Sequence, residues 1–121
     1  MPRTILIADD SDDIRSLMRM TLKFKGYTVL ECEDGQGAYD TLAANPDVDL
    51  LITDIAMPRM TGLQLVEKLR SEARFAKLPI VVCSAENKAI QEDVLSKGAS
   101  AILVKPFSPK DLLDLVGRML E

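Results

Sequence analysis

The chain has 121 residues, of which 47% are hydrophobic, and its formal net charge is −4. This composition favours a packed core over disorder, and an acidic chain without a basic run is a poor candidate for direct nucleic-acid binding. No apolar run approaches the roughly 18 residues of a membrane span, and the apolar run near the start is too short for a signal peptide. We therefore expect one domain over residues 1–121, cytoplasmic and without membrane insertion.

The first half of the chain predicts three strands and two helices. Apolar runs over residues 4–8, 28–32 and 50–53 have the length of strands. A helix is expected over residues 11–26, because a cap-type serine and two acids begin it, apolar residues follow at helical spacing, and a glycine ends it. A second helix over residues 34–46 begins at an aspartate–glycine turn and closes before a proline.

The second half continues the same alternation. Helical patterns cover residues 63–73, 88–98 and 108–120, and strand-like runs cover residues 80–83 and 101–104. The last helix has a serine cap, a proline at its first position and an acid at its third. Regular alternation of strand and helix predicts an α/β fold, a mainly parallel sheet covered by helices on both faces. The periodicity does not determine the strand order.

Charged residues stand where three of these strands end. Asp9 and Asp10 follow the first strand, Asp54 follows the third and Lys105 follows the fifth. Open α/β sheets place their sites at the carboxyl ends of the strands, so these side chains are expected to converge. Clustered carboxylates repel one another unless a cation or a proton intervenes, and oxygen ligands suit Mg²⁺. The pattern therefore predicts a Mg²⁺-dependent phosphoryl site.

The sequence contains no histidine, so any histidine chemistry must come from a partner. Its two cysteines, Cys32 and Cys83, lie in strand-like runs, which predicts buried free thiols that do not pair. Asp12 and Asp13 are expected to be ordinary first-turn acids, and Asp34 a turn or cap residue.

Several short motifs, at matching spacings along the whole chain, resemble the receiver domain of bacterial two-component response regulators. They are residues 8–11 (Ala-Asp-Asp-Ser), 53–58 (Thr-Asp-Ile-Ala-Met-Pro), 61–62 (Thr-Gly), 83–85 (Cys-Ser-Ala) and 104–107 (Val-Lys-Pro-Phe). The resemblance implies a CheY-like, flavodoxin-like (βα)₅ fold, doubly wound, with strand order 2-1-3-4-5. It also implies a cis peptide bond between Lys105 and Pro106.

The resemblance also implies the function and the reacting residues. Asp54 would accept a phosphoryl group, while Ser84 and Lys105 would contact the phosphoryl oxygens. The donor would be a histidine kinase, a phosphotransfer protein or a small phosphodonor. The domain would catalyse only its own phosphotransfer and autodephosphorylation. A surface of the fourth helix, fifth strand and fifth helix would then engage a downstream protein or output domain.

The same resemblance implies the metal ligands. Asp10, Asp54 and the backbone carbonyl of Ala56 would hold Mg²⁺, and Asp9 would hold a metal-bound water. Two features depart from the commonest family pattern or vary within it. Ile102 stands where many members carry a switch aromatic, and Ala56 and Glu86 occupy variable positions that tune the access of water.

Two other functions compete with this interpretation. Asp10, Ser11 and Asp12 imitate the nucleophile motif of a haloacid-dehalogenase-like phosphatase, in which Asp10 would be the nucleophile. Against this, the acids that such enzymes need after the lysine strand are missing. A binding module that never takes phosphate is the second alternative. Taken singly, Ser84 could also be a helix cap and Lys105 a solvated lysine.

Overall fold

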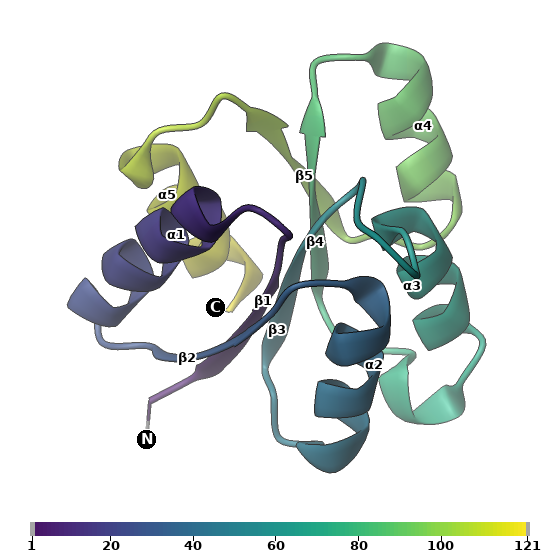
Figure 1. Ribbon diagram of the computed structural model, residues 1–121, viewed down its shortest axis with the longest axis horizontal. Coiled ribbons are helices and arrows are strands. Elements are labelled where there is room, and N and C mark those ends of the chain that lie inside the picture. The colour runs from purple at the N-terminus through teal and green to yellow at the C-terminus, as the bar shows by residue number, and fades with distance from the viewer. Residues whose placement is uncertain (1, 121) are drawn as a thin grey trace.

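The computed structural model describes residues 2–120, and its centre is a five-stranded parallel sheet (Figure 1). The strands lie in the order β2-β1-β3-β4-β5, which confirms the flavodoxin-like topology implied by the motifs. Their bounds are β1 (Thr4–Ala8), β2 (Thr28–Cys32), β3 (Leu50–Asp54), β4 (Ile80–Ala85) and β5 (Ala101–Lys105).

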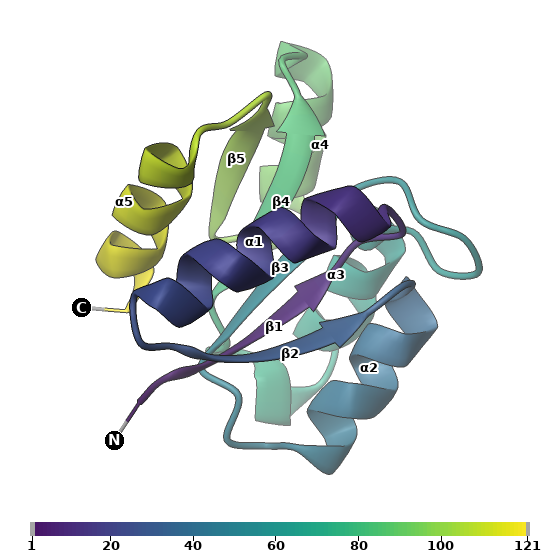
Figure 2. The same cartoon turned by 60° about the vertical axis from the view of Figure 1, so that its left-hand side comes forward.

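Helices cover both faces of the sheet (Figures 1 and 2). On one face lie α1 (Asp12–Phe24) and α5 (Pro109–Met119), and on the other lie α2 (Gly35–Ala44), α3 (Gly62–Arg70) and α4 (Lys88–Ser96). Each helix returns the chain to the start of the next parallel strand, so the strand ends and the helix beginnings share one edge, here called the carboxyl edge. Within residues 2–120, no helix has both the length and the apolar character needed to cross a membrane.

Alternating side chains of the strands enter two separate cores. Ile5 and Ile7 of β1 pack with α1 and α5, whereas Leu6 and Ala8 pack with the helices of the opposite face. All five residues of β3 are buried, as expected for a central strand that is covered on both faces. Each large apolar side chain buried in this way contributes about 1.5–3 kcal/mol. Asp54 is therefore attached to the most firmly held strand of the sheet.

Side-chain caps fix the beginnings of the helices. Ser11 accepts a hydrogen bond from the Ile14 backbone N–H, and Asp34 caps α2 by accepting from Gly37. The predicted cap of α5 is also confirmed, because Ser108 and the third helical residue form a reciprocal capping box. Asn87, which the sequence patterns did not identify, caps α4, so Ser84 is not used as a helix cap.

Three strands are longer than their apolar runs. The parallel ladder continues until β3 includes Asp54, β4 includes Ser84 and Ala85, and β5 includes Lys105. The apolar runs underestimated these strands because backbone pairing does not require apolar side chains. Consequently Asp54, Ser84 and Lys105 project from strands, which hold side chains more rigidly than loops do.

The third helix is shorter than predicted, since α3 ends at Arg70 and Ala73 belongs to a short 3₁₀ helix, η1 (Ala73–Phe75). The side chain of Arg70 donates hydrogen bonds that hold η1 in place after α3 ends. Its Nη1 donates to the Phe75 carbonyl at 2.7 Å, and its Nε donates to the Gly98 carbonyl at 2.8 Å. One cation thus satisfies the carbonyl group of the last η1 residue and that of Gly98, which follows α4. Hydrophobic periodicity contains no signal for bonds of this kind.

The two cysteines are free, Cys83 buried and Cys32 partly buried. They lie on β4 and β2, which β1 and β3 separate. Three inter-strand steps amount to roughly 14 Å, whereas a disulfide needs Cα atoms closer than about 7 Å. Burial raises the pKa of each thiol to about 12, so neither is a thiolate at neutral pH.

Gly62 allows α3 to begin directly against β3. A Cβ on Gly62 would overlap the Asp54 carbonyl oxygen and lie 2.9 Å from the Ile55 Cα. Because these are backbone atoms, side-chain rotation cannot relieve the overlap. We expect Gly62→Ala to lower the free energy of unfolding by about 1–3 kcal/mol in urea denaturation.

Gly117→Ala is the matched control, because Gly117 is also helical but a Cβ there would meet nothing within 4 Å outside its own stretch of helix. Replacing a glycine inside a helix by alanine should stabilise α5 by about 0.5–1 kcal/mol. Equal stabilisation by both substitutions would contradict the close approach of α3 to β3.

Candidate functional site

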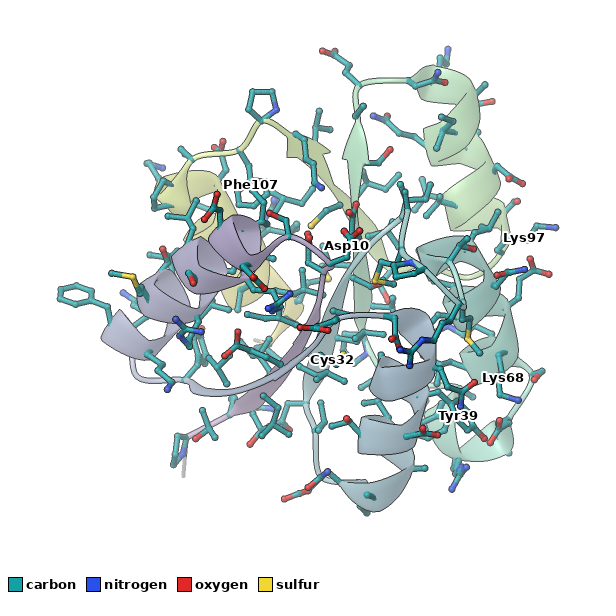
Figure 3. All side chains as sticks on the ribbon, viewed as in Figure 1. Asp10, Cys32, Tyr39, Lys68, Lys97 and Phe107 are labelled. Atoms are coloured by element: carbon teal, nitrogen blue, oxygen red, sulfur yellow. The ribbon has the colours of Figure 1, made fainter. Side chains whose placement is uncertain are left out.

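Three carboxylates meet at the carboxyl edge. Asp9 and Asp10 follow β1, Asp54 ends the neighbouring β3, and each offers an oxygen within 4.8 Å of the others. We call these three residues the acidic cluster. Figure 3 shows Asp10 at this edge, above the end of β1. The convergence predicted from the strand ends is thus found in the structure, because β1 and β3 pair in parallel with Ala8 opposite Thr53.

Asp9 is the most buried member of the acidic cluster, with 1% of its surface exposed. Its Oδ1 accepts a hydrogen bond from the Ser11 N–H at 2.8 Å, but its Oδ2 has no hydrogen-bond partner within the described chain. Burial raises the pKa of Asp9, the Ser11 bond opposes that rise, and the charges of Asp54 and Asp10 add to it. A buried carboxylate oxygen without a partner favours a cation or a proton beside it.

Lys105 supplies a positive charge from the end of β5. Its Nζ donates to Asp54 Oδ1 at 3.0 Å and lies 3.8 Å from Asp9 Oδ2. Burial lowers the pKa of Lys105, but the hydrogen bond to Asp54 and the charges of Asp54 and Asp9 outweigh burial and raise it. The lysine is therefore a firmly held cation. The peptide bond to Pro106 is cis, as the motif implied.

Asp54 accepts a second hydrogen bond at the same oxygen. The Ile55 N–H donates to Asp54 Oδ1 at 2.8 Å, a contact that the sequence patterns did not predict. Both hydrogen bonds recorded for this carboxylate in residues 2–120 thus fall on Oδ1. Oδ2 is left with free lone pairs on a residue that is 9% exposed.

Ser84 and Ala56 lie at the same edge as Asp54, one on the neighbouring strand and one in the loop after β3. On β4, Cys83 pairs with Asp54, and Ser84 is the next residue towards the carboxyl edge. Ser84 is buried, and its hydroxyl donates to the Ala85 carbonyl at 3.1 Å. Ala56 is exposed in the loop that follows β3. The structure therefore groups all the predicted site residues at one edge of the sheet.

The other acids near the site have ordinary structural roles. Asp12 and Asp13 are exposed in the first turn of α1, where acids complement the helix dipole. Asp34 caps α2 and pairs with Arg59 at 3.3 Å. The acidic cluster offers only oxygen donors, a set that fits a hard divalent cation.

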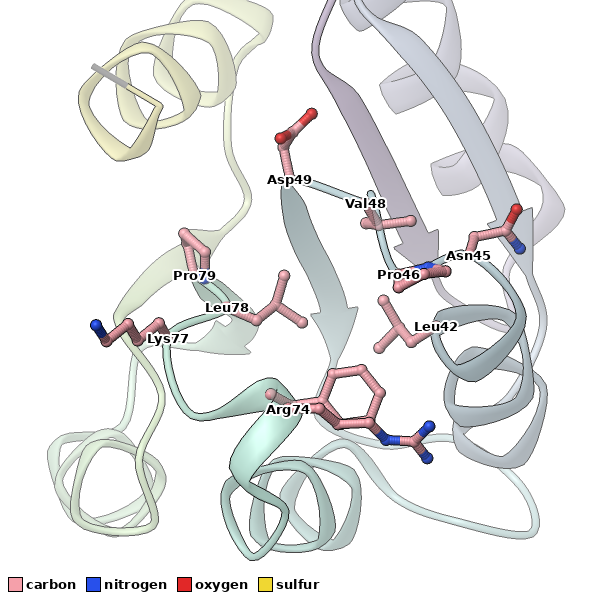
Figure 4. Close-up of a pocket in the computed structure, with 10 residues that line it drawn as sticks. Leu42, Asn45, Pro46, Val48, Asp49, Arg74, Lys77, Leu78 and Pro79 are labelled. Atoms are coloured by element: carbon pink, nitrogen blue, oxygen red, sulfur yellow. The ribbon is translucent and has the colours of Figure 1, made fainter.

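A separate hollow of about 250 Å³ lies at the opposite edge, between the segments that precede β3 and β4 (Figure 4). Pro46, Val48, Phe75 and Pro79 are among the residues that line it. None of the acidic cluster contributes to its walls. The hollow and the acidic cluster are thus two separate features of the structure.

Comparison with known proteins shows the family of the chain. Residues 5–117 match the family described as response regulator receiver domain. The chain belongs to this family. The receiver domain is 44% identical over 110 residues to chemotaxis protein CheY1 of Helicobacter pylori, covering 89% of each chain. It is 42% identical to a CheY homolog of Campylobacter jejuni, with 89% of this chain and 85% of that protein covered.

Solved structures support the same assignment. The receiver domain superimposes on chemotaxis response regulator CheY4 of Vibrio cholerae with a TM-score of 0.92 and 33% identity, covering 99% of this chain and all of that one. A response regulator from Chloroflexus aurantiacus gives a TM-score of 0.94 at 30% identity, with 99% and 98% covered. This chain is therefore a signalling domain, and the family match favours that function over the phosphatase alternative.

The burial of Asp9 predicts a pH-dependent stability. Because its pKa is raised in the folded protein, the stabilisation from its proton is complete below the ordinary pKa of 3.8 and is lost as pH rises through the raised value. Ionised Asp9 should therefore destabilise the metal-free domain at pH 7. We expect Asp9→Asn, which keeps the acceptor for Ser11, to raise the melting temperature at pH 7 in EDTA and to have less effect near pH 4.

Asp13→Asn serves as the control, because Asp13 is exposed and stabilises the beginning of α1 through the helix dipole. Its replacement should cost about 0.3–1 kcal/mol, a change of the opposite sign. An Asp9→Asn protein that melts no higher than wild type at pH 7 without metal would refute the repulsive cluster.

Proposed function

We propose that residues 1–121 act as one receiver domain, a phosphorylation-activated switch of a two-component system in which Asp54 accepts the phosphoryl group. The observation that carries this proposal is the Asp54 carboxylate, held by Lys105 at 3.0 Å beside two further carboxylates. The chain has no histidine. The phosphohistidine donor is thus a partner histidine kinase or phosphotransfer protein, and acetyl phosphate is a small-molecule substitute.

The acidic cluster fits Mg²⁺ as the cofactor. Three carboxylates offer oxygens within 4.8 Å of one another, and Asp9 Oδ2 is buried without a hydrogen-bond partner in the described residues. Asp10, Asp54 and the backbone carbonyl of Ala56 would hold the ion, and Asp9 would hold one of its waters. When bound, Mg²⁺ supplies the positive charge that offsets repulsion between carboxylate and phosphate.

The reaction is a direct transfer of a phosphoryl group. A free oxygen of Asp54 attacks phosphorus, and the bond from phosphorus to the donor nitrogen, or to the acetate oxygen, breaks. Its electron pair leaves with the donor, and an acyl phosphate remains on Asp54. Lys105 keeps the carboxylate oriented and stabilises negative charge on the transferring oxygens, because such catalysis is mainly positioning and electrostatics. Later attack by water on phosphorus releases inorganic phosphate and restores the carboxylate.

Ser84 links the phosphoryl group to the surface. Its hydroxyl donates to the neutral Ala85 carbonyl at 3.1 Å. A charged phosphoryl oxygen is a stronger acceptor, so phosphorylation would draw Ser84 away from that carbonyl. The next residues, Ala85, Glu86 and Asn87, are exposed and lead directly into α4. A change at Ser84 is therefore passed directly to the start of α4, through residues whose side chains are solvent-exposed.

The receiving surface comprises α4, β5 and α5. Apolar side chains are exposed there, with Ile90 40% and Leu95 47% accessible on α4 and Val104 37% accessible on β5. Ile102 of β5 is partly buried against the core beneath α2, α3 and α4. As a β-branched side chain it has few rotamers. The signal therefore passes through the loop after β4 and through α4 rather than through rotation of an aromatic ring.

The first test concerns the acceptor. Incubation with acetyl phosphate and Mg²⁺ should add one phosphoryl group, detected by intact-mass measurement, and EDTA should prevent it. Asp54→Asn should abolish the modification because an amide oxygen is a poor nucleophile. Asp13→Asn, which removes a charge of the same kind from the start of α1, should leave the modification intact.

Peptide mapping of the modified protein separates the alternatives. A phosphoryl group on Asp54 supports the receiver function, and one on Asp10 would instead support the phosphatase chemistry. If neither acetyl phosphate nor histidine kinases phosphorylate the folded, metal-loaded protein, the remaining alternative is a binding module that acts without phosphorylation.

The second test concerns transmission. Beryllofluoride stands in for the phosphoryl group on Asp54. Adding it with Mg²⁺ should shift backbone amide NMR signals outside the site most strongly from Ser84 to Lys97. Ser84→Ala should still be phosphorylated, but its shifts in α4 should be much smaller, because the link to the loop is removed. Distal shifts centred on Ile102 with α4 unchanged would contradict this route.

A further inference from the structure

Arg15 is a partly buried cation on α1, beside the acidic cluster but not part of it. Only 12% of its side chain is exposed, although arginine is seldom buried without partners. Its Nη1 donates to the backbone carbonyl oxygen of Asp9 at 2.7 Å. The acceptor is thus a main-chain group between Asp9 and Asp10, two members of the acidic cluster. This hydrogen bond has no role in the phosphotransfer proposed above.

The Asp9 carbonyl belongs to the peptide unit that joins Asp9 to Asp10. The six atoms of a peptide unit, including both Cα atoms, are coplanar. A hydrogen bond that fixes this oxygen therefore fixes the plane from which both acidic side chains project. A rotation of the same peptide would move both carboxylates relative to Asp54, which the rigid β3 holds in place.

The guanidinium of Arg15 is itself held by acids on two elements. It pairs with Asp12 in the first turn of α1, and it lies 3.6 Å from Glu31 and 3.8 Å from Glu33 at the end of β2. Exposed ion pairs such as these contribute little stability singly. Their geometric effect is larger, because a planar guanidinium with several donors is fixed in orientation when its partners lie on different sides.

We infer that Arg15 is a positioning residue for the cation site, which orients Asp9 and Asp10 through the backbone carbonyl that joins them. This inference rests on the proposed function, since it gives Arg15 a role in forming the Mg²⁺ site. Arg15 contacts neither the transferring group nor the ion.

The direction in which Mg²⁺ affinity changes distinguishes a positioning role of Arg15 from a purely electrostatic one. Removing a positive charge near a cation site should strengthen Mg²⁺ binding, because repulsion between the two cations disappears. Removing a positioning hydrogen bond should weaken binding, because the ligands are no longer oriented in advance. Loss of an outer partner of a metal ligand typically costs about 10–100-fold in metal affinity.

Arg19 provides the matched control. It lies one turn further along α1, and its Nη1 contacts the two oxygens of Glu31 at 3.0 and 2.9 Å. Arg19 thus shares the charge, the helix and one acidic partner with Arg15, but its hydrogen bonds go to Glu31 and Ser16 and not to Asp9. Arg19→Met therefore removes the same charge from the same helix without removing a hydrogen bond to the Asp9 carbonyl.

The experiment is Mg²⁺ titration by calorimetry of wild type, Arg15→Met and Arg19→Met, each checked for folding by circular dichroism. We expect Arg15→Met to bind Mg²⁺ about tenfold more weakly and Arg19→Met to bind no more weakly than wild type. Unchanged or tighter binding by Arg15→Met, or equal weakening by both substitutions, would overturn the inference.

Arg15→Lys decides the question if Arg15→Met does not fold. Lysine keeps the charge, but its single ammonium cannot donate to the Asp9 carbonyl and span the acids of β2 together. We expect its affinity for Mg²⁺ to lie between those of wild type and Arg15→Met. Wild-type affinity in a folded Arg15→Lys protein would then refute a positioning role.

NMR spectra of the metal-free proteins test the role of Arg15 independently of the proposed function. If wild type binds no Mg²⁺, the proposed cation site is wrong, and the inference is judged on the backbone amide signals of Asp10 and Ser11 in EDTA. Those signals should shift in Arg15→Met and stay in place in Arg19→Met. Identical signals in all three proteins would show that Arg15 does not orient this peptide.

Discussion

The carboxylates of Asp9, Asp10 and Asp54 repel one another at the carboxyl edge, and the Lys105 ammonium offsets only part of that repulsion. The consequence is visible at Asp9, where burial and neighbouring charge raise the pKa and one buried oxygen has no hydrogen-bond partner in the described chain. Such a cluster does not form unless the rest of the fold holds it together. The same excess of negative charge makes the edge receptive to a divalent cation.

Burial of apolar side chains on both faces of the sheet supplies the stability that offsets the repulsion within the acidic cluster. β3 is buried along its whole length, and α3 begins so close to it that only glycine fits at position 62. Parallel pairing continues through Asp54 and Lys105, so these side chains are borne by strands and not by loops. Asp54 thus occupies a position whose backbone is already fixed by the sheet, and Asp9 and Asp10 directly follow a strand that is buried in both cores.

The surroundings of the acidic cluster differ between its two sides. On the β1 side, the main chain of Asp9 is bonded to Arg15, and Arg15 is held by acids of α1 and β2. On the β4 side, the Ser84 hydroxyl donates to the adjacent Ala85 carbonyl, and the residues that lead into α4 are exposed. The carboxylates on the β1 side are thus held through their main chain by a charged network, whereas the Ser84 hydroxyl on the β4 side has only a neutral acceptor.

Local patterns were sufficient to predict the alternation of strands and helices, most caps, and the acids and lysine that gather at the carboxyl edge, because periodicity and capping depend on residues a few positions apart. The strand order came from the resemblance to receiver domains, since periodicity does not say which strands are neighbours. The early end of α3 at Arg70, the bond from Arg15 to the Asp9 carbonyl and the unpartnered oxygen of Asp9 were not predictable in this way. Each depends on where a side chain meets a backbone group or a charge on another element, and only the packed arrangement of the elements sets those distances.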